Sequence, residues 1–379
     1  MKKKILFVND EMTMGGVARI LNTFLKMIDK AEYEVDLLVL HKRGELLSEI
    51  PEGVNVIGGN EFFSTIDIPL SQCNIHNIFN KIRLLLYMKT GLIEGKIKKE
   101  RKKILNKKYD IEFSAKEGFC TIFTAYGDSA KKFNWVQVDY KESNYSSNHM
   151  ELMKKVLKHI DMNIACSDKV RDSYKELFDI ERIVTVHNLI DEERIYNMSL
   201  DKPKTKIDNN LINIICVARF HHQKGLDRLI RVYSRLTDYY NLTIVGDGEL
   251  KDELYSLSKE LGVFDKITWT GIMSNPYPEI RINDLFVMPS LYEGYPTITV
   301  ESLISDTPVL TLEVAGVKEQ ITKDYEGWVV DNSEESLFQI LNELKDKKEL
   351  LIRYKEELKN YHYDNQRILE RYYEIFKNN

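Results

Sequence analysis

Short apolar runs alternate with stretches whose apolar residues recur at helical spacing. The run at 4–8 is followed by a glycine-containing loop, an amphipathic stretch over 17–28 and a second apolar run at 35–40. Short, wholly apolar runs are typical of strands buried on both faces, and a strand–helix–strand unit of this length makes its two strands parallel. The alternation therefore predicts an α/β fold with a parallel sheet covered by helices.

The same alternation begins again near residue 211. Further strands are expected near 134–138 and 162–166 in the first series, and at 211–218, 241–245, 266–270, 284–289 and 308–311 in the second. Helices fit over 226–233 and 250–261, and Gly262 is well placed to end the latter in a left-handed cap. A chain of 379 residues is also long for a single core. We therefore expect two Rossmann-like domains in tandem.

The domain boundaries follow from the polar stretches. We expect an N-terminal domain over 1–190, a linker over 191–210, a C-terminal domain over 211–360 and a C-terminal helix over 361–379. Between residues 60 and 110 the alternation is weak.

Composition excludes several classes of protein. The net charge is −5, which offers no general attraction for nucleic acid. The four cysteines are scattered without metal-ligand spacing, so neither a structural metal nor a disulfide framework is expected. The apolar run after the first lysines is too short for a signal peptide, and we expect a cytoplasmic protein.

Two cations lie in the first loop of the second series, between an expected strand and an expected helix. Arg219 and Lys224 stand near the start of that helix, in a loop at the carboxyl end of a parallel strand. Ligands of open α/β sheets bind at this edge, and free amides at a helix start attract anions. An arginine and a lysine there suit a diphosphate, and if this loop stood alone, two solvated surface cations would be the alternative.

Two carboxylates follow the strand expected at 284–289. Glu293 lies in the loop, where it can accept hydrogen bonds from sugar hydroxyls, and Glu301 lies in the helix that follows, where it can hold a ribose diol. Gly294 permits close backbone approach, and the amides before Thr297 can point at a phosphate.

These residues resemble the E-x7-E retaining glycosyltransferases of the GT-B fold, glycosyltransferase family 4. Other segments agree in order and spacing: Gly15-Gly16-Val17-Ala18-Arg19 with the N-terminal glycine loop, Val245-Gly246-Asp247-Gly248-Glu249 with the G-x-G strand end, and Ala315-Gly316-Val317-Lys318-Glu319 with the G-G-x-x-E turn. The resemblance implies two domains facing a cleft, with the C-terminal helix returning to the N-terminal domain.

The resemblance also implies roles for individual residues. The implied donor-binding residues are Gly15, Gly16, Arg219, Lys224, Glu293, Gly294, Tyr295, Thr297 and Glu301, of which Arg219, Lys224 and Glu293 take part in catalysis. The donor would be a nucleotide sugar, expected to be a UDP-sugar, and the reaction would need no metal or cofactor. The acceptor would be a glycan, expected to be lipid-linked, in bacterial surface polysaccharide synthesis such as that of capsule, exopolysaccharide or O-antigen.

One segment departs from the family pattern. Trp135-Val136-Gln137-Val138-Asp139-Tyr140 resembles a W-x-H-x-D-Y segment, but Gln137 stands where the histidine is expected. Glutamine cannot take a proton at neutral pH, so Asp139 is the nearest titratable candidate on the acceptor side.

Other functions fit less well. No glycine pattern matches a dinucleotide-binding dehydrogenase or a P-loop. A sugar-nucleotide epimerase of the same fold and a non-catalytic partner of an active transferase remain as alternatives, and Gln137 is the one feature that favours the non-catalytic partner.

A basic amphipathic segment lies outside the family pattern. Residues 81–108 contain eleven Lys or Arg against two acids, with apolar residues interleaved. Such a segment can lie on an anionic membrane, which would place the protein on the inner face of the cell membrane, although a solvated basic helix is the alternative.

Overall fold

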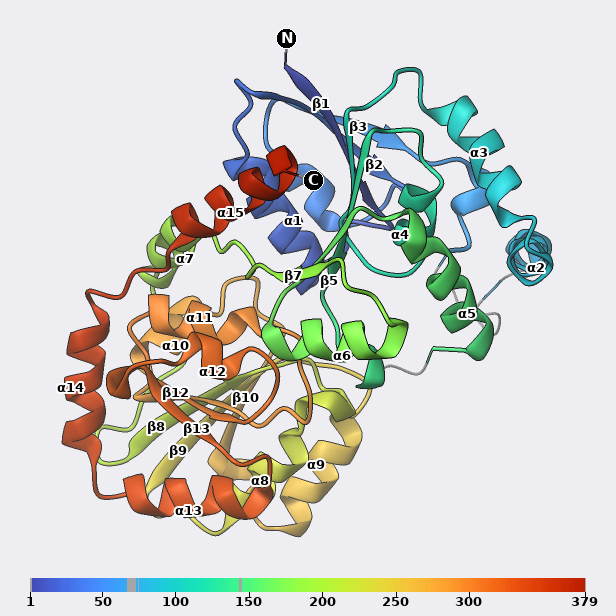
Figure 1. Cartoon of the computed structure of the whole chain (residues 1–379). Coiled ribbons are helices and arrows are strands. Elements are labelled where there is room, and N and C mark those ends of the chain that lie inside the picture. The colour runs from blue at the N-terminus through green and yellow to red at the C-terminus, as the bar shows by residue number, and fades with distance from the viewer. Residues whose placement is uncertain (1, 67–72, 74, 143–144, 379) are drawn as a thin grey trace. The chain divides into compact units, whose positions relative to one another are not determined.

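The computed structural model describes residues 2–66, 73, 75–142 and 145–378. The chain forms two compact units (Figure 1). Unit 1 comprises residues 1–189 and 365–379, and unit 2 comprises residues 190–364. Among the residues that the structure describes, no helix combines the length and the apolar character that a membrane span requires.

Unit 1 is built on a seven-stranded sheet with the order β3-β2-β1-β4-β5-β6-β7. Every neighbouring pair is parallel. The strands are β1 (Lys3–Asn9), β2 (Tyr33–Val39), β3 (Val54–Gly58), β4 (Ile111–Ser114), β5 (Lys131–Val136), β6 (Met162–Ala165) and β7 (Ile183–Thr185). The expected parallel α/β arrangement is confirmed.

The helices of unit 1 include one that comes from the end of the chain. They are α1 (Gly16–Met27), α2 (Ile75–Thr90), α3 (Ile93–Ile104), α4 (Phe119–Ala125), α5 (Ser147–Val156), α6 (Asp168–Phe178) and α15 (Asn365–Asn378). The indole of Trp135 donates a hydrogen bond to the hydroxyl of Tyr372 on α15 at 2.6 Å, and the rings of Tyr372 and Phe24 are 4.8 Å apart. The C-terminal helix thus completes the core of unit 1, as the family resemblance implied.

Unit 2 repeats the architecture with six parallel strands in the order β10-β9-β8-β11-β12-β13. The strands are β8 (Ile212–Val217), β9 (Tyr240–Val245), β10 (Ile267–Gly271), β11 (Leu285–Met288), β12 (Val309–Leu312) and β13 (Gly327–Val330). The helices are α7 (Glu192–Ser199), α8 (Leu226–Ser234), α9 (Lys251–Glu260), α10 (Tyr277–Ile282), α11 (Thr297–Ile304), α12 (Val317–Gln320), α13 (Glu334–Leu344) and α14 (Lys348–Leu358). Gly262 follows α9 with φ +68°, which is the expected left-handed cap.

The segment 191–210, expected as a linker, lies inside unit 2 and begins with α7. Asp191 starts this helix by accepting a hydrogen bond from the backbone N–H of Arg194. Ser199, at the end of α7, accepts a hydrogen bond from Arg281. The polar composition of this segment reflects a capped surface helix rather than a free connection.

Strand β4 does not appear in the sequence pattern because a charged residue interrupts it. Glu112, in the middle of β4, is wholly buried and accepts two hydrogen bonds of 2.7 Å from the guanidinium of Arg101 on α3. A buried carboxylate is tolerated when a hydrogen-bonded arginine neutralises it. The two residues are eleven positions apart, and only the folded chain shows that they form a pair.

Candidate active site

Four loops gather at the carboxyl edge of the unit 2 sheet. They follow β8, β9, β11 and β12, and glycines let them approach closely. A Cβ on Gly246 would lie 1.9 Å from the carbonyl oxygen of Ala218, and a Cβ on Gly225 would lie 2.3 Å from that of Pro289. Both glycines have positive φ, at +142° and +59°, so a side chain is disfavoured there on both counts. The close packing brings the Arg219–Lys224 loop against the loop that carries Glu293.

The two loops are joined by a charged contact. The ammonium of Lys224 lies 2.5 Å from Oε1 of Glu293, and the hydroxyl of Ser290 donates to the same oxygen at 2.8 Å. Gln223 donates to the carbonyl oxygen of Tyr292 at 2.9 Å and to Oε2 of Glu293 at 3.3 Å. The Glu293 side chain is only 10 % exposed, so this pair is only partly screened by water. The structure thus unites two residues that are 69 positions apart in the sequence.

Arg219 is placed differently. Its backbone accepts a hydrogen bond from the N–H of His221, but its guanidinium is exposed and has no partner among the described residues. An exposed guanidinium on the same loop as a lysine is suited to binding an anion.

Glycine 316 packs against the loop that follows Glu293. A Cβ on Gly316 would lie 2.7 Å from Cδ2 of Tyr295 and 3.2 Å from the carbonyl oxygen of Gly294. The side chain of Tyr295 is buried, and its hydroxyl is 3.0 Å from that of Tyr363. The Tyr295 side chain therefore helps to hold this loop in place.

Helix α11 begins directly after this loop. Thr297 is its first residue and Pro296 is its N-cap, which supplies no side-chain hydrogen bond. The first amides of a helix have no partner within the helix, so this end can face an anion. Glu301 lies one turn further on and is half-buried. The structure thus places Glu293 and Glu301 on a loop and on the helix that follows it, as expected.

The glycine loop of unit 1 precedes α1. Gly15 is the N-cap of α1 with extended backbone, and no side chain caps the helix. A Cβ on Gly16 would meet nothing within 4 Å, and one on Gly15 would meet only the carbonyl oxygen of Thr13, at 3.9 Å. The packing of the described residues therefore does not require glycine at either position. Close approach of a ligand to the backbone is a sufficient reason for it.

Gln137 and Asp139 are both engaged within unit 1. The amides of Gln137 and Asn188 exchange hydrogen bonds of 3.0 and 2.9 Å. Asp139 is buried and accepts hydrogen bonds from the Ser173 hydroxyl and from the backbone N–H of Lys141. These contacts give Asp139 a role in shaping the turn, which makes it a weaker candidate for a base.

Glu117 is a titratable group that the sequence pattern missed. It lies between β4 and α4, is 6 % exposed, and its carboxylate accepts the backbone N–H of Gln137 at 2.9 Å. Burial raises the pKa of this carboxyl, and among the described residues it has no cation at ion-pair distance. Ionisable groups whose pKa values are shifted by burial cluster at functional sites, so Glu117 is a further candidate. Glu117 was missed because the sequence pattern does not reveal β4, the strand that precedes it.

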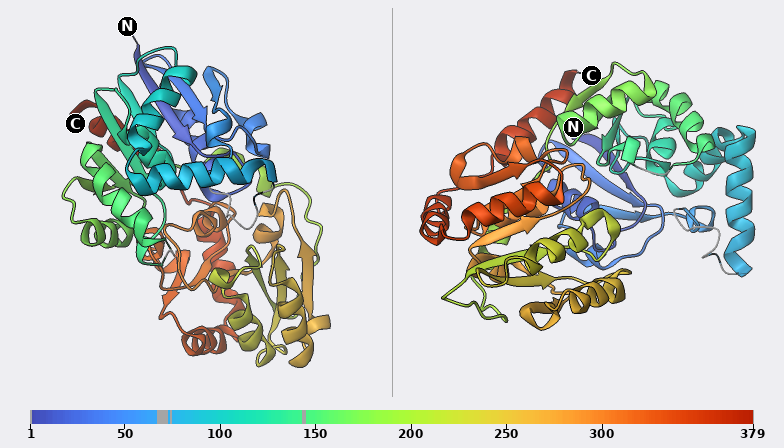
Figure 2. Two further views of the ribbon diagram at one scale, coloured as in Figure 1. Left: turned by 90° about the vertical axis from the view of Figure 1, so that its right-hand side faces the viewer. Right: turned by 90° about the horizontal axis from the view of Figure 1, so that it is seen from below.

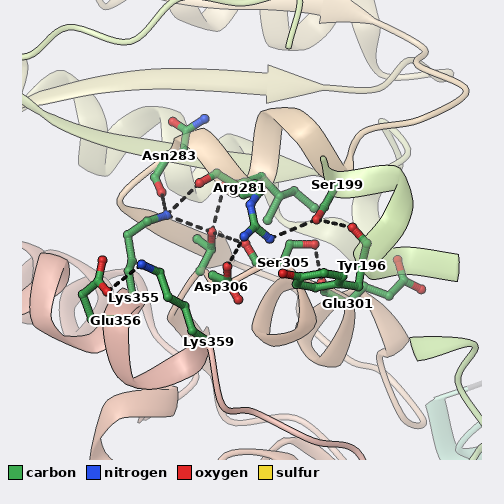
Figure 3. Close-up of polar contacts among 12 residues, drawn as sticks. Tyr196, Ser199, Arg281, Asn283, Glu301, Ser305, Asp306, Lys355, Glu356 and Lys359 are labelled. Atoms are coloured by element: carbon green, nitrogen blue, oxygen red, sulfur yellow. Dashed lines mark hydrogen bonds and ion pairs between the residues drawn. The ribbon is translucent and has the colours of Figure 1, made fainter. Parts of the chain in front are cut away.

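A second charged cluster in unit 2 lies near the starts of β11 and β12 and was also missed (Figure 3). The ammonium of Lys355 donates to the carbonyl oxygens of Arg281 and Asn283 and to the hydroxyl of Thr307, while Arg281 pairs with Asp306. Burial lowers the pKa of Lys355 to about 8. These contacts satisfy the carbonyls at the end of α10, so the cluster stabilises the fold.

Comparison with known proteins gives matches to glycosyltransferases. Residues 197–361 match the family model described as glycosyl transferases group 1. An uncharacterized glycosyltransferase of Methanocaldococcus jannaschii is 30 % identical over 182 residues, which cover 46 % of this chain and 45 % of that protein. N-acetylgalactosamine-N,N'-diacetylbacillosaminyl-diphospho-undecaprenol 4-alpha-N-acetylgalactosaminyltransferase of Campylobacter jejuni is 33 % identical over 176 residues, which cover 46 % of this chain and 47 % of that protein. The chain thus spans about half the length of these two relatives.

The whole fold has counterparts among solved structures. Anabaena HepE, solved in complex with UDP, superposes with a TM-score of 0.70 at 14 % sequence identity, covering 99 % of both chains. The expected GT-B fold is confirmed. Because residues 197–361 match a glycosyltransferase family model, the expected enzyme class, a glycosyltransferase, is also confirmed.

Proposed function

We propose that this protein transfers a sugar from a nucleotide-diphosphate-sugar donor to a hydroxyl of a glycan acceptor. The observation that carries the proposal is the contact between Lys224 and Glu293, with the guanidinium of Arg219, unpaired among the described residues, on the same loop as Lys224. The arrangement offers two cations for a diphosphate and a carboxylate for sugar hydroxyls, at the sheet edge where α/β folds bind ligands. HepE was solved with UDP, which supports a UDP-sugar as the donor.

The residues of unit 2 divide the work of donor binding. Arg219 and Lys224 hold the diphosphate and stabilise the charge that develops as the nucleotide leaves. Glu293, held by Ser290 and Gln223, accepts hydrogen bonds from the donor sugar, and its contact with Lys224 keeps that cation in place. Glu301 holds the ribose, and the amides at the start of α11 face the phosphate. Two cations and a helix end supply the neutralisation that a divalent metal supplies in other transferases, so we propose a metal-independent reaction.

The acceptor side belongs to unit 1. The Gly15-Gly16 loop is proposed to approach the phosphate, and Gln137 to hydrogen-bond a hydroxyl. Since Gln137 cannot take a proton, the donor phosphate is proposed to help deprotonate the acceptor, with retention of the anomeric configuration. The Campylobacter relative carries diphospho-undecaprenol in its name, and other relatives are named for lipopolysaccharide core biosynthesis. These names support a lipid-linked acceptor in surface polysaccharide synthesis, with a membrane surface as a partner.

Incubation with a panel of nucleotide sugars tests the function. We expect release of one nucleoside diphosphate, stimulated by acceptor, in the presence of EDTA. With an α-linked donor, the anomeric proton of the product should show an α linkage by NMR. No release from any donor with any acceptor preparation would favour a non-catalytic partner, and a β linkage would contradict the retaining mechanism.

The two carboxylates should respond differently to substitution. We expect Glu301→Gln to raise the KM for the donor with a smaller change in kcat, because it contacts the ribose in the ground state as well as in the transition state. We expect Glu293→Gln to lower kcat by about 10²-fold, since it removes a contact to the reacting sugar and loosens Lys224. Steady-state kinetics with varied donor separates the two effects. Similar changes of both parameters in both variants would contradict this division of roles.

A further inference from the structure

Helix α2 has an apolar face that no described part of the chain covers. Ile75, Phe79, Ile82 and Leu86 are exposed to 87, 68, 43 and 54 %. Their spacing of four, three and four residues aligns them in one stripe along the helix. Leu84, on the opposite side of the helix, is 2 % exposed and faces the protein. Figure 1 and the view from below in Figure 2 show α2 at the edge of unit 1, and in the side view it runs across the face turned to the viewer.

The charges on α2 have a single sign. The helix contains Lys81, Arg83 and Lys89 and no Asp or Glu. Arg83 and Lys89 are exposed, lie on either side of the apolar stripe, and have no ion-pair partner among the described residues. Lys81 donates to the carbonyl oxygen of Thr65 at 3.1 Å and so helps to anchor the helix. The exposed face is therefore apolar along its centre and basic along both sides.

Helix α3, which contains most of the basic residues of the segment 81–108, is different. Its apolar residues Ile93 and Ile97 are buried, and Arg101 is bound to Glu112. Other cations on α3 are paired locally: Lys96 and Lys103 with Glu100, and Lys98 with Glu94. The expectation that the whole segment 81–108 forms one membrane-facing surface is therefore wrong for α3, because tertiary packing uses its apolar face and much of its charge.

We infer that α2 lies on an anionic lipid bilayer, with Ile75, Phe79, Ile82 and Leu86 inserted at the boundary of headgroups and acyl chains. Arg83 and Lys89 then reach the lipid phosphates on either side of the stripe. An apolar stripe flanked by cations and free of acids matches the charge of such a surface, whereas a protein partner has no general reason to be anionic along both sides of a helix. This inference rests on the proposed function in one respect only: membrane binding would bring the protein to a lipid-linked acceptor.

Sedimentation of the full chain with vesicles tests the inference. The vesicles are pure phosphatidylcholine or phosphatidylcholine with about one third phosphatidylglycerol. We expect the protein to pellet with the anionic vesicles, to remain mostly in solution with the neutral ones, and to be released at about 0.5 M NaCl, where the Debye length is only a few ångströms.

Matched variants assign the binding to α2. We expect Phe79→Ser with Leu86→Ser, and separately Arg83→Gln with Lys89→Gln, to lower the bound fraction about tenfold, because each pair removes one of the two attractions. Ile272→Ser with Ile352→Ser removes exposed apolar side chains from unit 2, and Lys98→Gln with Lys99→Gln removes exposed charge from α3. Both control pairs should keep near-normal binding. Because all these positions are exposed, circular dichroism melts should show every variant folded.

Three results would overturn the inference. These are the absence of binding to anionic vesicles at low salt, an equal loss in the control pairs, or a dimer in solution that the α2 variants dissociate while vesicle binding is absent. The last would make the stripe a contact between copies of the chain. None of these measurements involves sugar transfer, so their failure and the failure of the proposed function are distinguishable.

Discussion

Replacing Arg219 or Lys224 with alanine is expected to lower turnover by about 10²- to 10³-fold, the usual effect of removing one charge partner of a transition state. Lys224 also orders Glu293 through their 2.5 Å contact, so Lys224→Ala should be the more damaging of the two. Steady-state kinetics with the donor identified by the panel measures both. Arg353→Ala on α14 removes a largely exposed arginine from the same unit and should leave the kinetics unchanged.

Stability should respond much less than activity to these two substitutions. The guanidinium of Arg219 is exposed and unpaired among the described residues, so its loss should change the free energy of unfolding by less than about 0.5 kcal/mol. Loss of Lys224 leaves Glu293 with donors from Ser290 and Gln223, and should cost about 1–2 kcal/mol. Near-normal turnover of both variants would mean that the donor site lies elsewhere. A parallel collapse of folding would mean that the pair is structural.

Substituting Tyr372 is expected to produce the largest loss of stability. Its side chain is wholly buried, accepts the hydrogen bond of the Trp135 indole and packs edge-on against Phe24. Tyr372→Ala should destabilise unit 1 by about 3–5 kcal/mol, as for other large buried aromatic residues. For a unit of this size, that corresponds to a fall of roughly 10 °C in the melting temperature.

Two further variants separate the causes. Tyr372→Phe keeps the ring but leaves the Trp135 N–H without an acceptor, and should cost about 1–2 kcal/mol. Arg371→Ala changes the neighbouring exposed residue of α15 and should have little effect. Urea unfolding followed by circular dichroism measures all three. If Tyr372→Ala were no less stable than Arg371→Ala, α15 would not belong to the core of unit 1.

Much of the architecture could be predicted from the sequence because most strands are buried on both faces. A strand that touches helices on both sides must be apolar throughout, so β1, β2, β8 and β9 appear directly as short apolar runs. Amphipathic helices such as α1 and α8 can also be recognised from the sequence. Each packs only one face against the core, so its apolar residues recur at helical spacing. The loops at the carboxyl ends of those strands could then be searched for Arg219 and Glu293.

The structure was needed wherever a residue depends on a distant partner. Glu112 reads as polar in the sequence, yet it lies in a buried strand because Arg101 neutralises it. The sequence of the basic segment 81–108 predicts a single exposed surface. In the structure, α3 buries its apolar side chains and pairs several of its charges inside unit 1, whereas α2 keeps an exposed apolar stripe. The same dependence hid Glu117, which became a candidate only when β4 was seen to place it beside Gln137.

For the candidate site too, some features were determined by local sequence and others only by tertiary structure. Local sequence determined which loops carry cations and carboxylates, because glycine positions and strand ends are local features. The 2.5 Å contact between Lys224 and Glu293, the burial of Tyr295 against Tyr363 and the engagement of Asp139 by Ser173 were decided by tertiary structure. The physical reason is that the chemistry of an ionisable group depends on its burial and its neighbours, and in a parallel sheet those neighbours come from strands far apart in the chain.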